Sequence, residues 1–175
     1  MIFASGLRRA VFTAGNDIKE LYAPRSTWRR YREFWLTQTK FLARLLETRL
    51  ATVCAIRGAC PAGGCVVALC CDYRVQTTSG SFGLNEVALG ISVPKYWAEL
   101  FLYRCTDRVK GERLLQLGTL VRPTEAQSLG LINEVVGEGA LLAAAESALD
   151  RYVKVPSGAR AQTKRTIRAH FSAER

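Results

Sequence analysis

The chain has 175 residues, of which 25 are Lys or Arg and 15 are Asp or Glu, so its formal net charge is +10 at pH 7. This length and an apolar content of 49% are typical of one globular domain with a core of its own. No apolar run approaches the ~20 residues of a membrane helix, and residues 1–4 are too few for the core of a signal peptide, so the sequence predicts no membrane span and shows no targeting signal.

Short elements are predicted for the first two dozen residues. Residues 1–5 are typical of the end of a strand, and residues 11–17 are predicted to be a strand that ends in a turn of small residues. Asp17 is placed to cap a short helix over residues 18–22, because an Asp side chain accepts hydrogen bonds from the free N–H groups at a helix start. Pro24 ends this segment.

A long amphipathic helix is predicted over residues 27–50. Apolar side chains recur there at spacings of three and four, which predicts one buried face. This stripe comprises Trp28, Tyr31, Phe34, Trp35, Phe41, Leu42, Leu45 and Leu46. We interpret it as core rather than as a binding surface. The opposite face is basic, since seven positive charges fall between Arg25 and Arg49.

The segment over residues 57–75 is the most informative. A strand is predicted over residues 51–56, a loop of small residues over residues 58–64, and a buried helix over residues 65–71 that starts from Gly63 and Gly64 and ends at Asp72. Such a loop lets another molecule approach the backbone. The free N–H groups and the positive dipole end of the helix would then stabilise a negative oxygen. A tight turn whose glycines serve packing alone is an equal alternative on local composition.

A single carboxylate stands out in the next stretch. After a turn over residues 77–80 and a short strand over residues 81–83, a loop is predicted over residues 85–90, and the segment ends at Pro94. Glu86 is the only carboxylate between Asp72 and Glu99, and its neighbours are apolar. Local composition favours a solvent-facing Glu86, because carboxylates are rarely buried. A role in chemistry is the alternative.

Helices dominate the remaining predicted elements. Thr106 is placed to cap one of them, and Gly118 and Gly130 are placed to end two. The predicted helices cover residues 95–104, 107–117, 122–130, 140–153 and 157–171, and a strand covers residues 131–136. Seven further positive charges lie between Arg151 and Arg175. Basic faces of this kind attract a polyphosphate group, nucleic acid or an anionic membrane surface, or are simply solvated.

The cysteines are predicted to be small buried apolar side chains in a reducing compartment. Five of the six lie in the strand, loop and helix around residues 54–71. The six are Cys54, Cys60, Cys65, Cys70, Cys71 and Cys105. No metal site is expected, because Cys60 and Cys65 have no second pair and His170 is the only histidine.

Three stretches of the chain carry a resemblance to a known family. They read V-F-T-A-G-N-D-I (residues 11–18), G-A-C-P-A-G-G-C-V-V-A-L-C-C-D-Y-R (58–74) and L-N-E-V-A-L-G-I-S-V-P (84–94). In this order and at these spacings they resemble the crotonase (enoyl-CoA hydratase/isomerase) superfamily, most closely its mitochondrial Δ3,Δ2-enoyl-CoA isomerase branch. The stretch R-P-T-E-A-Q-S-L-G-L-I-N-E-V-V (122–136) is similar to the segment that follows the active site in that family.

The resemblance implies an α/β fold, a crotonase-like spiral of ββα turns with C-terminal helices used in trimerisation. A homotrimer or homohexamer is therefore expected, with a core over residues 1–136 and a C-terminal helical segment over residues 137–175. Family members carry a further strand-helix-strand portion before the position of residue 1, and residues 1–5 match a central strand there. The core is thus expected to be N-terminally incomplete, and truncation is preferred over a diverged sheet because the later motifs are intact.

The resemblance also implies roles for individual residues. The backbone N–H groups of Ala14 and Gly63 would form an oxyanion hole for a thioester carbonyl, and Glu86 would shuttle a proton. Family hydratases have a second glutamate where this chain has Val66, so isomerisation without hydration is implied. The residues expected to bind substrate are Asp17, Ile18, Pro61, Val66, Leu89 and Trp97. Candidates for the CoA phosphates are Lys19, Lys164 and Arg168.

The predicted function is a Δ3,Δ2-enoyl-CoA isomerase in the β-oxidation of unsaturated fatty acids. Its partner is an acyl-CoA thioester, with no cofactor beyond the coenzyme A of the substrate, and the resemblance implies the mitochondrial matrix, with a peroxisome-type organelle as the alternative. The alternative functions are a truncated non-catalytic or RNA-binding crotonase-like protein, or another acyl-CoA enzyme of the family. Nucleic acid is disfavoured, because the aromatic residues of the helix over 27–50 are expected to be buried and so unable to stack on bases.

Overall fold

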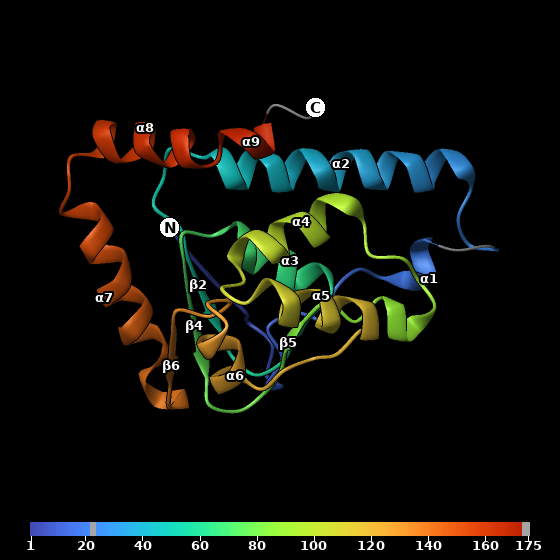
Figure 1. The fold of residues 1–175 in the computed structure, drawn as a ribbon, viewed down its shortest axis with the longest axis horizontal. Helices are drawn as coiled ribbons and strands as arrows, with labels where there is room; N and C mark the ends of the chain where they lie inside the picture. Colours follow the sequence, from blue (N-terminus) through green and yellow to red (C-terminus); the bar gives the residue numbers. More distant parts are fainter. Residues whose placement is uncertain (22–23, 173–175) are drawn as a thin grey trace.

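Parallel strands form both sheets of the computed structural model, which describes residues 1–21 and 24–172 (Figure 1). The main sheet contains β1 (Ile2–Ala4), β2 (Val53–Ile56), β4 (Tyr73–Thr77) and β6 (Glu134–Val136), in that spatial order. Its register pairs Val53 with Ile2 on one side and with Tyr73 on the other. The smaller sheet contains β3 (Cys60–Pro61) and β5 (Phe82–Gly83). The strand end predicted at residues 1–5 is present as β1, at an edge of the described sheet.

Helices connect and cover these strands. They are α1 (Ile18–Leu21), α2 (Trp28–Glu47), α3 (Gly63–Cys70), α4 (Lys95–Arg104), α5 (Arg108–Leu117), α6 (Pro123–Ser128), α7 (Leu141–Val153), α8 (Ser157–Ile167) and α9 (Ala169–Ser172), with 3₁₀ turns η1 (Val87–Leu89) and η2 (Glu138–Ala140). In Figure 1, α2 runs along the top of the molecule with α8 and α9 beside its end, and α7 stands outside the main sheet.

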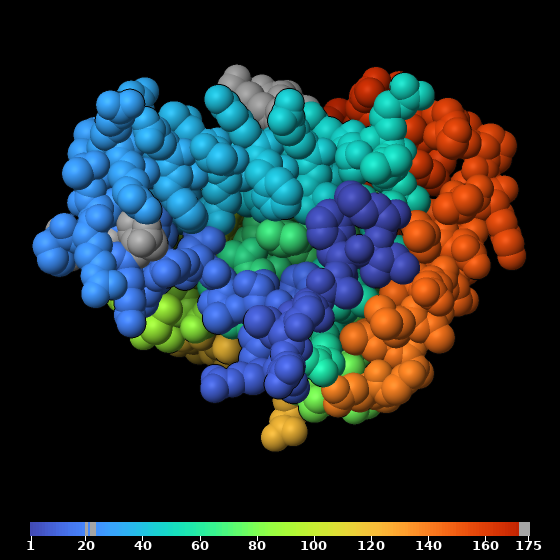
Figure 2. All heavy atoms as spheres, turned by 180° about the vertical axis from the view of Figure 1, so that it is seen from behind, coloured from blue at the N-terminus to red at the C-terminus, as the bar shows by residue number. Residues whose placement is uncertain are grey.

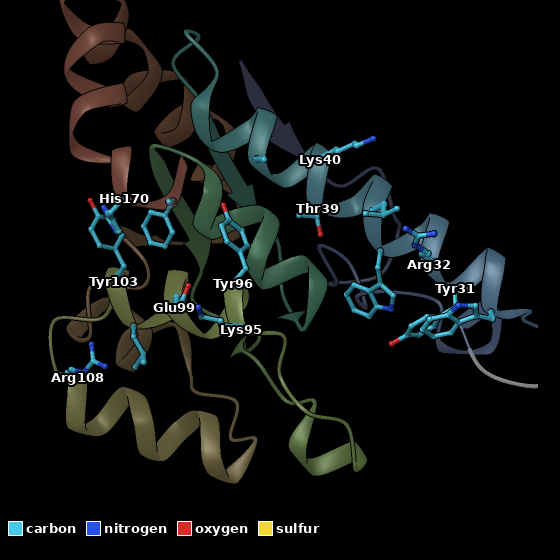
Figure 3. Close-up of a pocket in the computed structure, with 16 residues that line it drawn as sticks. Tyr31, Arg32, Thr39, Lys40, Lys95, Tyr96, Glu99, Tyr103, Arg108 and His170 are labelled. Carbon is cyan, nitrogen blue, oxygen red and sulfur yellow. Dashed lines mark ion pairs between the residues drawn. The ribbon is translucent and has the colours of Figure 1, made fainter. Parts of the chain in front are cut away.

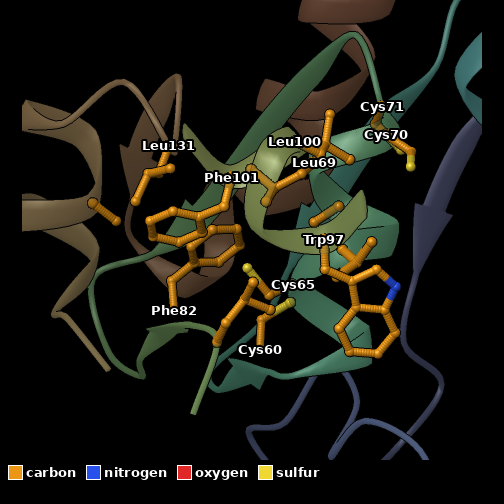
Figure 4. Close-up of a cluster of buried hydrophobic side chains, with 14 of the residues drawn as sticks. Cys60, Cys65, Leu69, Cys70, Cys71, Phe82, Trp97, Leu100, Phe101 and Leu131 are labelled. Carbon is orange, nitrogen blue, oxygen red and sulfur yellow. The ribbon is translucent and has the colours of Figure 1, made fainter. Parts of the chain in front are cut away.

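The central strands β2 and β4 of the main sheet are buried on both faces, which explains why β2 is a continuous apolar run. Alternate residues Val53 and Ala55 of β2 pack with α7 in one cluster. Cys54 and Ile56 point the other way, into the larger core formed with α2, α3 and α4. Figure 4 shows part of this larger core, including Phe82, Phe101 and Trp97 around the cysteines of β3 and α3. This core holds α3 behind the loop that precedes it.

All six cysteines are free and buried, which confirms their predicted role as small apolar side chains. Burial raises the pKa of the Cys70 thiol to about 12, so that this side chain stays neutral. Among the described residues, no group of three or more His, Cys, Asp or Glu side chains is placed to hold a metal ion. No described helix is long and apolar enough to cross a membrane.

Several predicted element ends are wrong for identifiable reasons. Asp107, not Thr106, caps α5, because its Oδ1 accepts a hydrogen bond from the N–H of Lys110 at 2.9 Å. The strand predicted over residues 11–17 is reduced to a single bridge between Val11 and Ala59. The helix predicted over 157–171 is broken at Arg168, whose side chain binds inside the core. The predicted end of α1 at residue 22 lies outside the described residues.

The predicted buried face of α2 is confirmed only in part, for leucines near the C-terminal end of the helix. Leu42, Leu45 and Leu46 are buried, whereas Trp28 is 77% exposed and Phe41 is 46% exposed. Figure 1 shows the first turns of α2 extending past α4, so the core ends before the aromatic stripe does. Thr27 caps this exposed end by accepting a hydrogen bond from the N–H of Arg30 at 3.2 Å.

Candidate active site

A small cavity lies where the turn after residue 13, the loop before α3 and the η1 segment meet α2 and α4. Its volume is about 100 Å³. The structure brings together seven of the nine residues that were expected at the site, namely Ala14, Ile18, Pro61, Gly63, Glu86, Leu89 and Trp97. Figure 2 shows the N-terminal segment in dark blue below α2, with green atoms from the middle of the chain visible between them.

Two turns of small residues touch each other at this cavity. A methyl group added to Gly15, whose φ is +90°, would lie 2.9 Å from the Cβ of Ala62 and 3.3 Å from the nitrogen of Gly63. A methyl group added to Gly64 would overlap the side chain of Thr13. Only glycine fits such contacts. The glycines of two separate motifs therefore allow the backbones on either side of the cavity to meet.

Two backbone N–H groups at this junction have no intramolecular acceptor among the described residues. Gly63 is the first residue of α3, so its N–H has no acceptor within the helix. The N–H of Ala14 likewise donates no hydrogen bond within the described chain. Ala62, between the two turns, has φ 53° and ψ −131°, a conformation that is strained for a residue with a side chain. Backbone strain of this kind points to a functional turn.

Glu86 brings a carboxylate into the cavity. Its side chain is 6% exposed, and neither carboxylate oxygen has a hydrogen-bond partner among the described residues. Burial raises the pKa of Glu86 above its ordinary value. A carboxyl group whose pKa is raised toward neutral pH is suited both to accepting and to returning a proton.

The local expectation that Glu86 faces solvent is wrong. Its apolar neighbours Val87 and Leu89 are 40% and 55% exposed, while the glutamate side chain points inward. The 3₁₀ turn η1 produces this inverted pattern, and Gly90 ends the turn with φ 74°. A turn that exposes two apolar side chains and buries a carboxylate lowers the stability of the fold. Its presence therefore indicates that the carboxylate has a catalytic role.

Two expected site residues do not line the cavity. Asp17 is exposed, and its Oδ1 accepts a hydrogen bond from the N–H of Lys19 at 3.0 Å, so it caps α1 as predicted and contributes nothing to the lining. Val66 is fully buried in the larger core and is not among the described residues that line the cavity. Its expected role in substrate binding therefore stays a prediction.

Two of the three candidates for the CoA phosphates are wrong. Lys164 and Arg168 are 6% and 3% exposed, and both bind Asp72 inside the protein. The Lys164 ammonium lies 2.9 Å from one Asp72 oxygen, and the Arg168 guanidinium lies 2.7 Å from the other. These cations dock α8 and cannot reach a ligand in solution. Lys19 is exposed and stays a prediction.

Seven lining residues were not among the expected site residues, and three of these have polar or aromatic side chains. Trp35 was predicted as core, yet it lines the cavity and packs at 5.8 Å against the ring of Trp97. Asn16 also lines the cavity, and its Oδ1 accepts a hydrogen bond from Gln38 of α2 at 2.6 Å. Asn85 lies beside Glu86, with an Oδ1 that has no partner among the described residues. The two asparagines could have been predicted to line the cavity, because each is close in sequence to a predicted site residue.

A larger groove lies between α2, α4 and α9, away from Glu86 (Figure 3). Its volume is about 930 Å³, and its lining combines aromatic rings with the cations of Arg32, Lys40, Lys95 and Arg108. The ion pair between Lys95 and Glu99, at 3.5 Å, lies on its α4 side. Neither predicted oxyanion residue lines this groove, so its size does not make it the catalytic cavity.

A model of a protein family described as enoyl-CoA hydratase/isomerase matches residues 1–175. The chain belongs to this family. The mitochondrial enoyl-CoA delta isomerase 1 of human is 39% identical over 170 residues, which is 92% of this chain and 53% of that protein. The mouse protein of the same name is 38% identical over 160 residues, which is 90% of this chain and 54% of that protein.

A hydratase also appears among the relatives of this family member. The short-chain-enoyl-CoA hydratase of Clostridium acetobutylicum is 28% identical and covers 87% of this chain and 57% of that protein. The crystal structure of human mitochondrial delta3-delta2-enoyl-CoA isomerase superposes with a TM-score of 0.92 at 37% identity, over 98% of this chain and 66% of that one. The crotonase fold expected from the motifs is thus confirmed. The chain spans about half the length of the curated relatives it matches.

Proposed function

We propose that this chain carries the active site of a Δ3,Δ2-enoyl-CoA isomerase, which converts a 3-enoyl-CoA into the trans-2-enoyl-CoA. The observation that carries the proposal is Glu86, a buried carboxylate without a partner that lines a cavity with Ala14 and Gly63. The similarity to enoyl-CoA delta isomerase 1 of human and mouse supports the same activity. A role in the β-oxidation of unsaturated fatty acids follows from this reaction.

The reaction needs one group that moves a proton and one site that stabilises negative charge. The Glu86 carboxylate takes a proton from C2, and the electron pair of that C–H bond forms a C1–C2 double bond as the carbonyl electron pair moves onto the thioester oxygen, while the C3–C4 double bond is kept. The thioester oxygen then carries the charge of a dienolate, and the N–H groups of Ala14 and Gly63 donate hydrogen bonds to it. Glu86 returns the proton to C4: the carbonyl re-forms, the C1–C2 electron pair becomes the C2–C3 double bond, and the C3–C4 electron pair takes the proton. No cofactor is needed beyond the coenzyme A of the substrate.

A single carboxylate favours isomerisation over hydration. Glu86 is the only carboxylate among the described residues that line the cavity. Addition of water across a double bond needs a water that is held and activated, whereas proton transfer from C2 to C4 needs only one base in a site that excludes water. The cavity volume of about 100 Å³ equals the space of roughly three waters. It therefore accommodates the reacting thioester end and not a whole acyl-CoA.

The proposal is tested by assaying 3-hexenoyl-CoA isomerisation with wild type and Glu86→Gln. Gln keeps the shape of the side chain but cannot accept the proton, so kcat is expected to fall by about 10²- to 10⁴-fold. Val87→Gln is the matched control, because it changes an exposed position on the same turn that does not line the cavity. Hydration of crotonyl-CoA, measured in parallel, is expected to stay at background. A Glu86→Gln variant as active as wild type contradicts the proposal.

The compartment is also proposed rather than observed. The human and mouse relatives are named mitochondrial, which supports the mitochondrial matrix over a peroxisome-type organelle. Free buried cysteines fit a reducing compartment of either kind. Fluorescence microscopy of the tagged chain, with markers for both organelles, distinguishes the two.

A nucleic-acid-binding crotonase-like protein is the second candidate, and one observation favours it. The aromatic residues of α2 were expected to be buried, yet Trp28 is 77% exposed and stacks on Tyr31 at 5.7 Å. Arg29 and Arg32 are the sequence neighbours of these two rings. Exposed rings beside cations bind single-stranded nucleic acid. Filter binding of a single-stranded RNA at several salt concentrations tests it, since such binding falls steeply with salt, and Trp28→Ala should weaken it.

A further inference from the structure

Arginine side chains from other segments bind the C-terminal end of α3, the helix whose first residue lines the cavity. Arg104 of α4 donates from Nε to the carbonyl of Leu69 at 3.1 Å and from Nη2 to the carbonyl of Cys71 at 3.4 Å. Arg74 of β4 donates from Nη1 to the same Cys71 carbonyl at 3.0 Å. Charged donors therefore satisfy carbonyl groups that a glycine turn or water usually satisfies.

A third guanidinium reaches the same end of α3. Arg168 donates from Nη1 to the carbonyl of Cys70 at 3.3 Å and to the carbonyl of Leu46 in α2 at 2.7 Å. Its Nη2 pairs with Asp72, whose second oxygen pairs with Lys164. Asp72, the buried carboxylate beside these arginines, is therefore shared by two cations. Positive charge therefore exceeds negative charge around the end of α3.

This accumulation of charge exceeds what capping a helix requires. Arg74 and Arg168 are only 2% and 3% exposed. Burial, together with the charges of Arg74 and Arg168, lowers the pKa of Arg104 to about 10. Burying like charges near one another is unfavourable. A neutral cap would satisfy the same carbonyl groups, so the charge itself needs another explanation.

The two ends of α3 are electrostatically connected. The helix has eight residues, so that it is about 12 Å long. Seven of the eight residues are buried, so little water screens the field along it. The dipole places positive potential at Gly63, while the negative pole at the other end reduces that potential. Cations bound to the negative pole remove this reduction.

We propose that Arg74, Arg104 and Arg168 strengthen the oxyanion hole by cancelling the negative pole of α3 and by fixing the helix behind Gly63. This inference rests on the proposed function, because it concerns the charge of the dienolate. The three arginines do not line the cavity, so they are positioning residues that act through α3. Arg104 is the member best suited to a test, since it is partly exposed and lies outside the ion pairs of Asp72.

The test measures how strongly the site stabilises an enolate, using acetoacetyl-CoA as the probe. This thioester loses a proton to give an enolate that absorbs in the ultraviolet, so its pKa when bound reports the potential at the oxyanion hole. Arg104→Gln keeps a donor for the α3 carbonyls but removes the charge. We expect a three- to tenfold loss of bound enolate at fixed pH and a similar fall in kcat for 3-hexenoyl-CoA, with KM unchanged within twofold.

Matched variants separate charge from structure. Arg104→Lys keeps the charge and is expected to restore most of the bound enolate. Arg113→Gln removes an exposed arginine on α5 and is expected to match wild type. Tyr103→Glu leaves all three arginines in place but adds a carboxylate beside Arg104, whose guanidinium lies 5.4 Å from the Tyr103 ring. It is expected to lower bound enolate as Arg104→Gln does, with Tyr103→Gln as its neutral control.

Two results would overturn the inference. One is a wild-type enolate signal in Arg104→Gln, or in Tyr103→Glu where Arg104→Gln does not fold. The other is an Arg104→Lys variant as defective as Arg104→Gln, which would mean that only the shape of the guanidinium matters. Failure of the proposed function looks different. In that case wild type neither isomerises 3-hexenoyl-CoA nor shifts the pKa of acetoacetyl-CoA, and this inference fails with it.

Discussion

Glu86 is a residue whose placement lowers the stability of the fold but suits its proposed function. A carboxylate with 6% exposure and no hydrogen-bond partner is unfavourable when it is charged. The surrounding fold must therefore supply free energy to keep it in the cavity. Residues of this kind are expected at sites where a raised pKa is useful, because the same burial that destabilises the charged form also produces a better base.

The pH dependence of stability tests this reading of Glu86. Burial raises its pKa in the folded protein, so between the ordinary and the raised pKa the folded state binds more protons than the unfolded state. The free energy of unfolding should therefore fall as pH rises through that window. We expect Glu86→Gln to remove this part of the slope and to be as stable as wild type, or more so, at pH 7. Urea unfolding over a pH series measures it, and parallel slopes would contradict the assignment.

Ala62 allows a second test at the same scale. Its φ of 53° is unfavourable for a residue with a Cβ, typically by about 1–3 kcal/mol. Ala62→Gly should therefore raise the free energy of unfolding by about 1 kcal/mol, after allowing for the flexibility of glycine in the unfolded chain. Ala68→Gly inside α3 is the control and should lower it by about 1 kcal/mol. Equal losses in both variants, by urea unfolding, would show that Ala62 is not strained.

The sequence predicts some site residues well and others poorly. Ala14, Gly63 and Glu86 lie in short motifs whose spacing brings them together, and all three line the cavity. Trp35 is different, because its place in the lining depends on where α2 crosses α4, a contact between segments far apart in the chain. The stripe on α2 predicted burial but not which neighbour the ring would meet.

At the scale of elements, a buried ion cluster attaches α8 to the core, beside hydrogen bonds from Arg160 and Lys164 to the carbonyl groups of Arg49 and Leu50. Asp72 binds Lys164 and Arg168 of the C-terminal segment. It also accepts hydrogen bonds from the backbone and hydroxyl of Thr52 at 2.9 and 3.1 Å. Burial opposes ionisation of Asp72, yet the charges of Arg168 and Lys164 hold its pKa below the ordinary value. The cluster thus connects the residue before β2, the segment after α3 and the C-terminal part of α8.

Asp72→Asn tests the strength of this attachment. The change leaves two buried cations without a counter-charge, which typically costs about 3–5 kcal/mol. We expect a loss of that size in the free energy of unfolding at pH 7, whereas Asp150→Asn on the exposed side of α7 should have little effect. Because the folded pKa of Asp72 is lowered, its contribution is present above the ordinary carboxyl pKa and is lost as pH falls through the folded value. A variant within 1 kcal/mol of wild type by urea unfolding would show that the cluster is not what holds α8, since such a loss is well below the ~3 kcal/mol expected for a broken buried pair.

Element boundaries were predictable where local chemistry sets them. Gly118 ends α5 with φ 60°, as its position in the sequence indicates. The break between α8 and α9 was not predictable, because Arg168 leaves the helix to reach carbonyl groups of α2 and α3. The exposed start of α2 was missed for the opposite reason, since its apolar pattern continues beyond the core that would bury it.

At the scale of the whole molecule, exposed apolar side chains favour association between copies of the chain, whereas the positive net charge opposes it. Trp28 and Leu36 on α2 are 77% and 48% exposed, and both line the large groove beside α4. Exposed apolar patches of this kind are typical of interfaces. The net charge of +10 works against contact between identical chains, because like-charged surfaces repel. Assembly is therefore expected to depend on how well salt screens that repulsion.

The homotrimer implied by the family resemblance gives this competition a measurable outcome. Light scattering should report about three times the chain mass of 19.4 kDa, and the fraction of trimer should rise with salt because screening weakens the repulsion. Nucleic-acid binding has the opposite salt dependence, so the two associations cannot be confused. Leu36→Glu should reduce assembly if the groove is part of the interface, while Leu142→Glu on exposed α7 serves as the control. A mass of 19.4 kDa at every salt and protein concentration would contradict the trimer.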